Sequence, residues 1–172
     1  MQKELERKYK ITNIGSLRNT IIKLGAKFLG SSCGVDLYFK IPQKIERTKY
    51  LRIRTKEKEK NGTLAYHEVV DNFTTKEWEI EISDKDIAKD IIQKIGFPID
   101  VIVKKEREKY LLDRVEVVLD KINDLGSFVE VESPTVELLK KTINRLRLQK
   151  KDIISGAGYP DLLKEKNAAK IK

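Results

Sequence analysis

Charged residues recur an even number of positions apart in several segments of this 172-residue chain. In a β-strand successive side chains point to opposite faces, so residues with even spacing share one face. The acidic rows are Glu4 and Glu6, then Glu77, Glu79 and Glu81, then Glu116 and Asp120, and then Glu130 and Glu132. The basic rows are Arg52 and Arg54, and Lys105 and Arg107, while Lys8 follows Glu4 and Glu6 on the same face.

Rows of this kind are suited to phosphoryl transfer. Carboxylates at alternate strand positions can hold Mg²⁺ or Mn²⁺, and paired cations can clamp phosphate oxygens, arginine in a bidentate manner. Metal and cations together stabilise the charge of the transition state. For any one strand, a half-exposed sheet whose charges face water is the better explanation of the pattern. The strands taken together favour an enclosed site, because solvent faces usually mix threonine, serine and glutamine with their charges.

The elements that must position these residues are about eight strands and three helices. Strands are expected at residues 3–11, 34–41, 50–56, 63–70, 75–82, 99–112, 115–121 and 127–132. Helices are expected where apolar residues recur at helical spacing, namely Ile14, Leu17, Ile21 and Leu24, then Ile87, Ile91 and Ile95, then Val136, Leu139, Ile143 and Leu146. Trp78, on the strand face opposite Glu79, is expected in the core.

Many strands with few helices favour an α+β fold, a closed antiparallel eight-stranded β-barrel with the helices packed outside. The apolar strand faces would then pack outward on the helices, and the charged faces would converge inside. Such charges are costly unless the barrel holds water, metal and a polyanion. With no linker or repeat in view, residues 1–164 form one domain, and residues 165–172 form a disordered Lys-rich tail.

Composition narrows the choice of partner and compartment. Lysine and arginine number 36 against 27 aspartate and glutamate, a formal net charge of +9, which indicates an anionic partner. The single cysteine, Cys33, excludes an intrachain disulfide and favours a reducing compartment. The first residues are charged, unlike a signal peptide, and no apolar run approaches the roughly 20 residues that cross a bilayer. We therefore expect a soluble cytoplasmic protein with no membrane partner.

The segment Glu4-x-Glu6-x-Lys8 resembles the motif that defines the CYTH superfamily of triphosphate tunnel metalloenzymes. That superfamily contains class IV adenylate cyclases, thiamine triphosphatases and inorganic triphosphatases. Further segments resemble the family in the same order, from about residue 4 to residue 163: Asp36-x-Tyr38-Phe39, Leu51-Arg52-Ile53-Arg54, Lys105-x-Arg107-x-x-Tyr110, Leu119-Asp120, Leu125-Gly126-x-Phe128-x-Glu130-x-Glu132 and Tyr159-x-Asp161-Leu162-Leu163.

The resemblance implies a role for each matching residue in the barrel. The metal ligands, for Mg²⁺ or Mn²⁺, would be Glu4, Glu6, Asp120, Glu130 and Glu132. The substrate-binding residues would be Lys8, Arg52, Arg54, His67, Glu79, Lys105 and Arg107. The catalytic set would be Glu4, Glu6, Lys8, Lys105 and Arg107. The chain departs from its relatives at Thr75, often an arginine, and at His67, often a lysine; His67 either faces the tunnel in place of that lysine or is a structural strand histidine.

Three functions follow, and they belong to different classes. The first is a metal-dependent triphosphatase that hydrolyses an inorganic or organic triphosphate, acting as a monomer or homodimer. The second is a class IV adenylate cyclase, in which the 3′-hydroxyl of ATP attacks the α-phosphorus and pyrophosphate leaves. The third is a basic nucleic-acid-binding barrel, which the net charge favours. The twelve aromatic residues do not interleave with the basic ones as a base-stacking platform requires, so nucleic acid is the weaker expectation.

Overall fold

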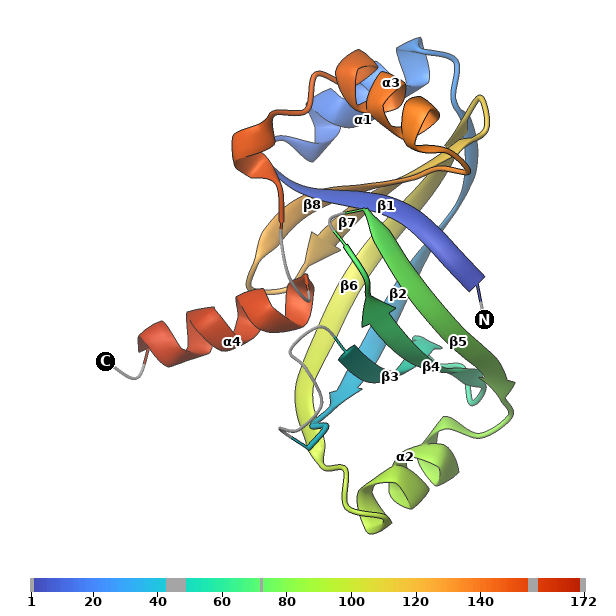
Figure 1. Ribbon diagram of the computed structural model, residues 1–172, viewed down its shortest axis with the longest axis vertical. Coiled ribbons are helices and arrows are strands. Elements are labelled where there is room, and N and C mark those ends of the chain that lie inside the picture. Colours follow the sequence, from blue (N-terminus) through green and yellow to red (C-terminus); the bar gives the residue numbers. More distant parts are fainter. Residues whose placement is uncertain (1, 43–48, 72, 155–157, 171–172) are drawn as a thin grey trace.

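The fold is a closed β-barrel with helices outside it (Figure 1). The computed structural model describes residues 2–42, 49–71, 73–154 and 158–170. In these residues eight strands follow one another around the barrel in the order β1-β5-β4-β3-β2-β6-β7-β8. Every neighbouring pair is antiparallel. The expectation of an α+β fold with an eight-stranded antiparallel barrel is confirmed.

The strands are β1 (Gln2–Ile11), β2 (Lys27–Phe39), β3 (Lys49–Lys56), β4 (Gly62–Val69), β5 (Thr74–Ile82), β6 (Ile99–Leu112), β7 (Val115–Ile122) and β8 (Gly126–Glu132). The α-helices are α1 (Ile14–Lys23), α2 (Lys85–Lys94), α3 (Val136–Arg145) and α4 (Tyr159–Lys170). A short 3₁₀-helix, η1, covers Lys150–Asp152. In the described part of the chain, no helix combines the length and the apolar character needed to cross a membrane.

The period-two pattern of the strands decides which side chains enter the barrel. On β8, Val129 and Val131 point outward and are fully buried under α1 and α3, whereas Glu130 and Glu132 point inward. The largest hydrophobic cluster therefore lies outside the barrel, where Ile21 of α1 and Leu139 of α3 cover the outer faces of β1, β6, β7 and β8. In Figure 1 these two helices lie together at one end of the barrel. Burial of aliphatic side chains here supplies the main driving force for folding.

Helix α2 shows a different face to the barrel from the one expected. The predicted stripe of Ile87, Ile91 and Ile95 is mostly exposed, at 59%, 53% and 65% of each residue's surface, and the barrel is covered instead by Ala88 and Ile92. Both sets recur every four residues, so the periodicity alone does not decide between them. Trp78, expected in the core, is likewise 40% exposed, and its ring lies 5.8 Å from that of Tyr66.

Two further expectations are corrected. Strand β2 begins at Lys27 rather than at residue 34, because pairing with β6 continues through a register shift at Gly30, where φ is +140°. The segment 165–170, expected as disordered tail, continues helix α4, and residues 171–172 lie outside the described residues. Tyr159 and Leu163 anchor α4 beside Phe128, and the lysines, glutamate and alanines that follow have high helix propensity.

Candidate active site

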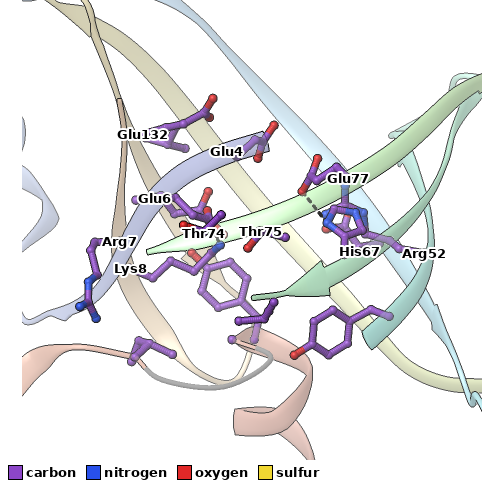
Figure 2. A pocket seen from close by; sticks show the side chains of 18 of the residues that line it. Glu4, Glu6, Arg7, Lys8, Arg52, His67, Thr74, Thr75, Glu77 and Glu132 are labelled. Atoms are coloured by element: carbon purple, nitrogen blue, oxygen red, sulfur yellow. Dashed lines mark hydrogen bonds and ion pairs between the residues drawn. The ribbon is translucent and has the colours of Figure 1, made fainter. Parts of the chain in front are cut away.

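The interior of the barrel is a cavity of about 950 Å³ whose walls are mostly charged (Figure 2). In the described residues, each of the strands contributes at least one side chain to its wall. Of the predicted site residues, those that line the cavity are Glu4, Glu6, Lys8, Arg52, Arg54, His67, Glu79, Lys105, Arg107, Glu130 and Glu132. Asp120 is fully buried and lies behind Arg107. The structure thus brings together predicted residues from seven separate strands, and the eighth, β2, contributes Asp36 and Tyr38 to the wall.

One wall of the cavity is acidic. The strand register places Glu6 of β1 and Glu116 of β7 on either side of Glu132 of β8, and Glu4 follows on β1. Burial and the nearby carboxylates of Glu77 and Glu132 raise the pKa of Glu4 to about 8. The pKa of Glu132 is raised as well, by burial and then by Glu116 and Glu6. This wall carries more negative charge than its neighbours neutralise, which favours the binding of a cation.

Two lysines border the acidic wall. Lys8 Nζ donates to Glu6 Oε2 at 2.6 Å and lies 3.6 Å from Glu130 Oε1. Lys109 Nζ donates to Glu116 Oε1 at 2.8 Å. Although burial opposes the charged form, Glu130 and Glu6 raise the pKa of Lys8 above its usual range. Lys8 is therefore charged and lies next to the carboxylates of Glu6 and Glu130.

The donor chemistry of the acidic wall fits a hard divalent cation. Mg²⁺ and Mn²⁺ prefer carboxylate oxygens and water. Among the described residues, no three His, Cys, Asp or Glu side chains are already gathered as a metal site. The fit thus rests on the oxygen donors of Glu4, Glu6, Glu116 and Glu132 and on the charge that raises the pKa of Glu4. Binding of a cation would relieve that repulsion.

A second wall is cationic and is organised around Asp36 of β2. Arg54 Nε and Nη2 donate to the two carboxylate oxygens of Asp36 at 3.0 and 3.2 Å, and Lys105 Nζ donates to Oδ2 at 2.7 Å. Burial alone would raise the pKa of Asp36, but Arg54 and Lys105 hold it well below its usual range. Arg52 lies 3.6 Å from Glu79 Oε2. One buried carboxylate thus holds two cations that face the cavity.

The predicted metal ligands Asp120 and Glu130 are engaged by a cation. Arg107 Nε and Nη2 donate to Asp120 at 2.7 and 2.5 Å, and Nη2 also donates to Glu130 Oε2 at 2.8 Å. The Tyr159 hydroxyl of α4 donates to Asp120 Oδ2 at 2.9 Å. All four side chains are buried. The contacts give Asp120 and Glu130 a structural role, and their role toward a metal stays a prediction.

His67 lines the cavity, as the resemblance implied, and is 6% exposed. Its Nδ1 contacts Glu77 Oε1, which the dashed line in Figure 2 marks. Burial, together with the charge of Arg52, lowers the pKa of His67 although Glu77 opposes this change. Within the described residues three buried polar atoms of this wall have no hydrogen-bond partner, namely His67 Nε2, Arg52 Nε and the Tyr50 hydroxyl.

Sequence reasoning did not assign a site role to Asp36, Glu77 or Glu116. Asp36 belongs to the family motif on the second strand. As a single charged residue among apolar ones, it could have indicated a site residue. Glu77 shares a strand face with the assigned Glu79, and Glu116 shares one with the assigned Asp120. The alternation of side chains therefore predicts that both point into the barrel. Their partners could not be inferred, since pairing depends on the register between strands that are distant in sequence.

Lys105 makes the stability of the ligand-free protein depend on pH. Burial and the neighbouring Arg54 lower its pKa to about 7, from 10.5 in an unfolded chain. Between these values the unfolded chain binds more protons than the folded one, so stability rises with pH. Compared with Lys105→Met, the wild type should gain roughly 1 kcal/mol of unfolding free energy per pH unit between pH 7.5 and 9. Urea unfolding of both proteins at several pH values measures this, and parallel curves would contradict it.

Comparison with known proteins adds the family. Residues 2–153 match the model of the CYTH domain. A candidate adenylate cyclase of Methanocaldococcus jannaschii is 28% identical over 141 residues, covering 80% of this chain and 81% of that protein. A solved Pyrococcus horikoshii protein is 29% identical with a TM-score of 0.80, covering 88% of this chain and 94% of that one. A Hippeastrum protein described as an adenylyl cyclase candidate with a dominant triphosphatase activity shares the fold, at 16% identity and a TM-score of 0.67, with 96% of each chain covered.

Proposed function

The chain belongs to the CYTH domain family, and from the charges inside its barrel we propose that it is a divalent-metal-dependent hydrolase of triphosphates. The observation that carries the proposal is the opposition of two walls in one cavity. Four carboxylates line one wall, and the cations of Arg52, Arg54 and Lys105 line another. A triphosphate with its metal ion has this pattern of charge, with phosphate oxygens for the cations and a metal for the carboxylates.

The chain's own residues divide the work. Arg52, Arg54, Lys105 and Lys8 hold the phosphate chain and neutralise its charge, and they do so in a cavity where water screens charges poorly. Glu4, Glu6, Glu116 and Glu132 would hold Mg²⁺ or Mn²⁺, which when bound polarises phosphate oxygens and lowers the pKa of water. Asp36 positions Arg54 and Lys105 before the substrate arrives, so little reorganisation accompanies the reaction.

Enclosure of the cations also favours a small substrate over nucleic acid. Arg52 and Lys105 are 7% and 6% exposed, inside the barrel. A duplex backbone contacts cations on an outer surface, and the carboxylates of the cavity would repel it. A triphosphate-containing small molecule is therefore the partner that we propose.

The test is a product assay. The protein is incubated with tripolyphosphate, thiamine triphosphate or ATP, each with Mg²⁺ and with Mn²⁺, and orthophosphate and cyclic nucleotide are separated by chromatography. We expect orthophosphate and a shortened phosphate chain, with little cyclic AMP. Cyclisation requires that the adenosine be held so that its 3′-hydroxyl lies in line with the α-phosphorus, whereas hydrolysis requires only water.

The second candidate is a class IV adenylate cyclase, which the name of the Methanocaldococcus jannaschii relative favours. The same metal and phosphate ligands would serve it, since only the phosphorus that is attacked differs. Cyclic AMP as the main product from ATP would establish this candidate and overturn the hydrolase.

Arg52 should contribute to affinity for the triphosphate and little to folding. Its ion pair with Glu79 is 3.6 Å long, and the Glu79 side chain is 43% exposed. Its Nε has no partner among the described residues, so a phosphate is its best available acceptor. Arg52→Ala should weaken triphosphate binding roughly 10- to 100-fold. It should leave the melting temperature of the free protein unchanged or raise it, since repulsion with Arg54 is removed.

Thermal shift with and without tripolyphosphate measures both effects, because a ligand that binds the folded state alone raises the melting temperature. Lys56→Ala is the matched control: Lys56 continues the same face of β3 but its side chain is 66% exposed and lies outside the cavity wall. A large loss of ligand-free stability in Arg52→Ala would show instead that the Glu79 pair is structural.

A further inference from the structure

A histidine and a glutamate form a buried pair in the cavity wall. The register sets His67 of β4 directly opposite Glu77 of β5 on one side and Tyr50 of β3 on the other. His67 Nδ1 contacts Glu77 Oε1 (Figure 2), and neither side chain is more than 15% exposed. The figure also shows Glu77 between His67 and Glu4, so the pair lies beside the acidic wall.

This contact fixes how the imidazole is protonated. A carboxylate only accepts hydrogen bonds, so the neutral imidazole carries its proton on Nδ1 and donates it to Glu77. Nε2 then keeps its lone pair and can only accept. Burial, aided by Arg52, lowers the pKa of the ring, which keeps His67 neutral at neutral pH. Nε2 is a buried acceptor with no partner in the part of the chain that the structure describes, and the His67 residue lines the cavity.

The chemistry of Nε2 restricts what it can bind. The oxygens of an ionised phosphate accept hydrogen bonds, so they are complementary to Arg52 and Arg54 and not to a neutral Nε2. Nε2 needs a donor, either water or a hydroxyl or N–H group of the substrate. An ionised inorganic triphosphate offers no donor, and water is then the remaining partner. A neutral imidazole held by a carboxylate is also the arrangement that accepts a proton from water during catalysis.

We propose that His67, oriented by Glu77, is the general base that takes the proton of the water attacking the terminal phosphorus. The inference rests on the proposed hydrolase function. The water oxygen forms the new P–O bond as its proton passes to Nε2, and the bridging P–O bond breaks with its electron pair on the departing diphosphate oxygen. The imidazolium then releases its proton to solvent, which restores the base.

The groups around His67 suit this cycle. Glu77 of β5 stabilises the imidazolium that forms, and it holds the ring in the tautomer that leaves Nε2 free to accept. Arg52 and Arg54 of β3 act in the opposite sense, and their charge returns the ring to its neutral form. Glu77 is thus a positioning residue, whereas His67 contacts the reacting water.

The experiment compares His67→Gln and Glu77→Gln with the wild type, with tripolyphosphate as substrate and saturating Mn²⁺. The glutamine in His67→Gln can still accept a hydrogen bond but is not basic, so kcat should fall by about 10²-fold while KM changes little. Thr63→Val is the matched control: its hydroxyl is also buried without a partner in the described residues, and it lies on the same strand face but outside the cavity wall. It should keep the wild-type kcat.

A pH profile separates a catalytic from a structural role. The wild-type kcat should decline as the pH falls through the pKa of His67, which lies below its usual value of 6.5. That decline should be absent in His67→Gln and should move to lower pH in Glu77→Gln, since the carboxylate that raises the pKa is lost. A decline that is identical in all three proteins would overturn the assignment.

The outcomes also separate this inference from the function on which it rests. If the wild type hydrolyses tripolyphosphate and His67→Gln does so with undiminished kcat, the general base is overturned and the hydrolase stands. If His67→Gln hydrolyses tripolyphosphate with the kinetics of the wild type and raises only the KM for ATP, His67 binds a substrate hydroxyl and not water. That result also overturns the general base. If the wild type hydrolyses none of the triphosphates, both proposals fail.

Discussion

Replacing Glu4 or Glu6 with glutamine should lower metal-dependent triphosphatase activity by about two orders of magnitude or more while the protein stays folded. Each substitution keeps the shape of the side chain and removes one anionic oxygen donor from the acidic wall. Loss of a ligand charge weakens metal binding and the stabilisation that the metal gives the transition state. The loss should be partly recovered at high Mn²⁺ concentration, because the remaining carboxylates still attract the ion.

The fold should tolerate the loss of the Glu4 charge because Glu4 is repelled by its surroundings. Burial raises its pKa most, and Glu77, Glu132 and Glu6 raise it further, so a neutral side chain removes unfavourable interactions. The melting temperature of metal-free Glu4→Gln should equal or exceed that of the wild type at pH 8 and above, where the wild-type carboxylate is ionised. Calorimetric titration of Mn²⁺ into each protein measures the affinity without any turnover.

Glu81→Gln provides the matched control for this experiment. Glu81 continues the inward-facing row of β5 but is exposed at the end of the strand and lies outside the cavity wall. Its replacement should leave both activity and Mn²⁺ affinity unchanged. Full activity in both Glu4→Gln and Glu6→Gln would show that the acidic wall does not hold the catalytic metal.

The alternation of charged and apolar residues was enough to predict the barrel and the contents of its interior. Val129 and Val131 are apolar and were therefore expected to be buried. Because side chains alternate along a strand, Glu130 and Glu132 then point to the opposite face of the sheet. With eight such strands, closure of the sheet sends the charged faces into one cavity. That inference needs only the local period of each strand, which the sequence displays directly.

The sequence could not predict which charged side chains inside the cavity pair with one another, because this depends on the register between strands. Glu130 and Glu132 are both glutamates, and they lie on the same face of β8. The register sets Asp120 opposite Arg107, and the Arg107 side chain reaches Glu130 as well, whereas Glu132 has Glu6 and Glu116 for neighbours. One carboxylate therefore has its pKa lowered, mainly by Arg107 against the effect of burial, and the other has its pKa raised.

The helices were predicted less well for a related reason. A helix with two apolar stripes can pack on either one, and the barrel surface around Phe39 and Ile53 accommodates Ile92 of α2. The exposed residues Ile87, Ile91 and Ile95 then remain on the outside. Helix α4 was missed because its polar composition was typical of a tail, although Tyr159 at its start donates a hydrogen bond into the ion-pair network of the barrel.

Arg107→Ala should destabilise the protein by about 3 to 5 kcal/mol, which is enough to unfold many domains of this size. The substitution leaves Asp120, which is fully buried, and Glu130, with 11% of its side chain exposed, without the cation that neutralises both. Tyr159 would still donate to Asp120, and Lys8 would still lie 3.6 Å from Glu130, but the fully buried Asp120 would lose the cation that contacts it. Arg52→Ala, by contrast, leaves behind only a half-exposed carboxylate and should cost little.

A neutral replacement tests whether charge is the cause. The triple variant Arg107→Met with Asp120→Asn and Glu130→Gln removes the cation and both anions together, so it should be markedly more stable than Arg107→Ala alone, since no uncompensated charge is buried. Urea unfolding followed by circular dichroism compares the three proteins. A stable Arg107→Ala variant that has lost only its affinity for triphosphate would contradict the structural role. Arg107 would then be a phosphate ligand, and Asp120 and Glu130 would be available to bind the metal, as the sequence predicted.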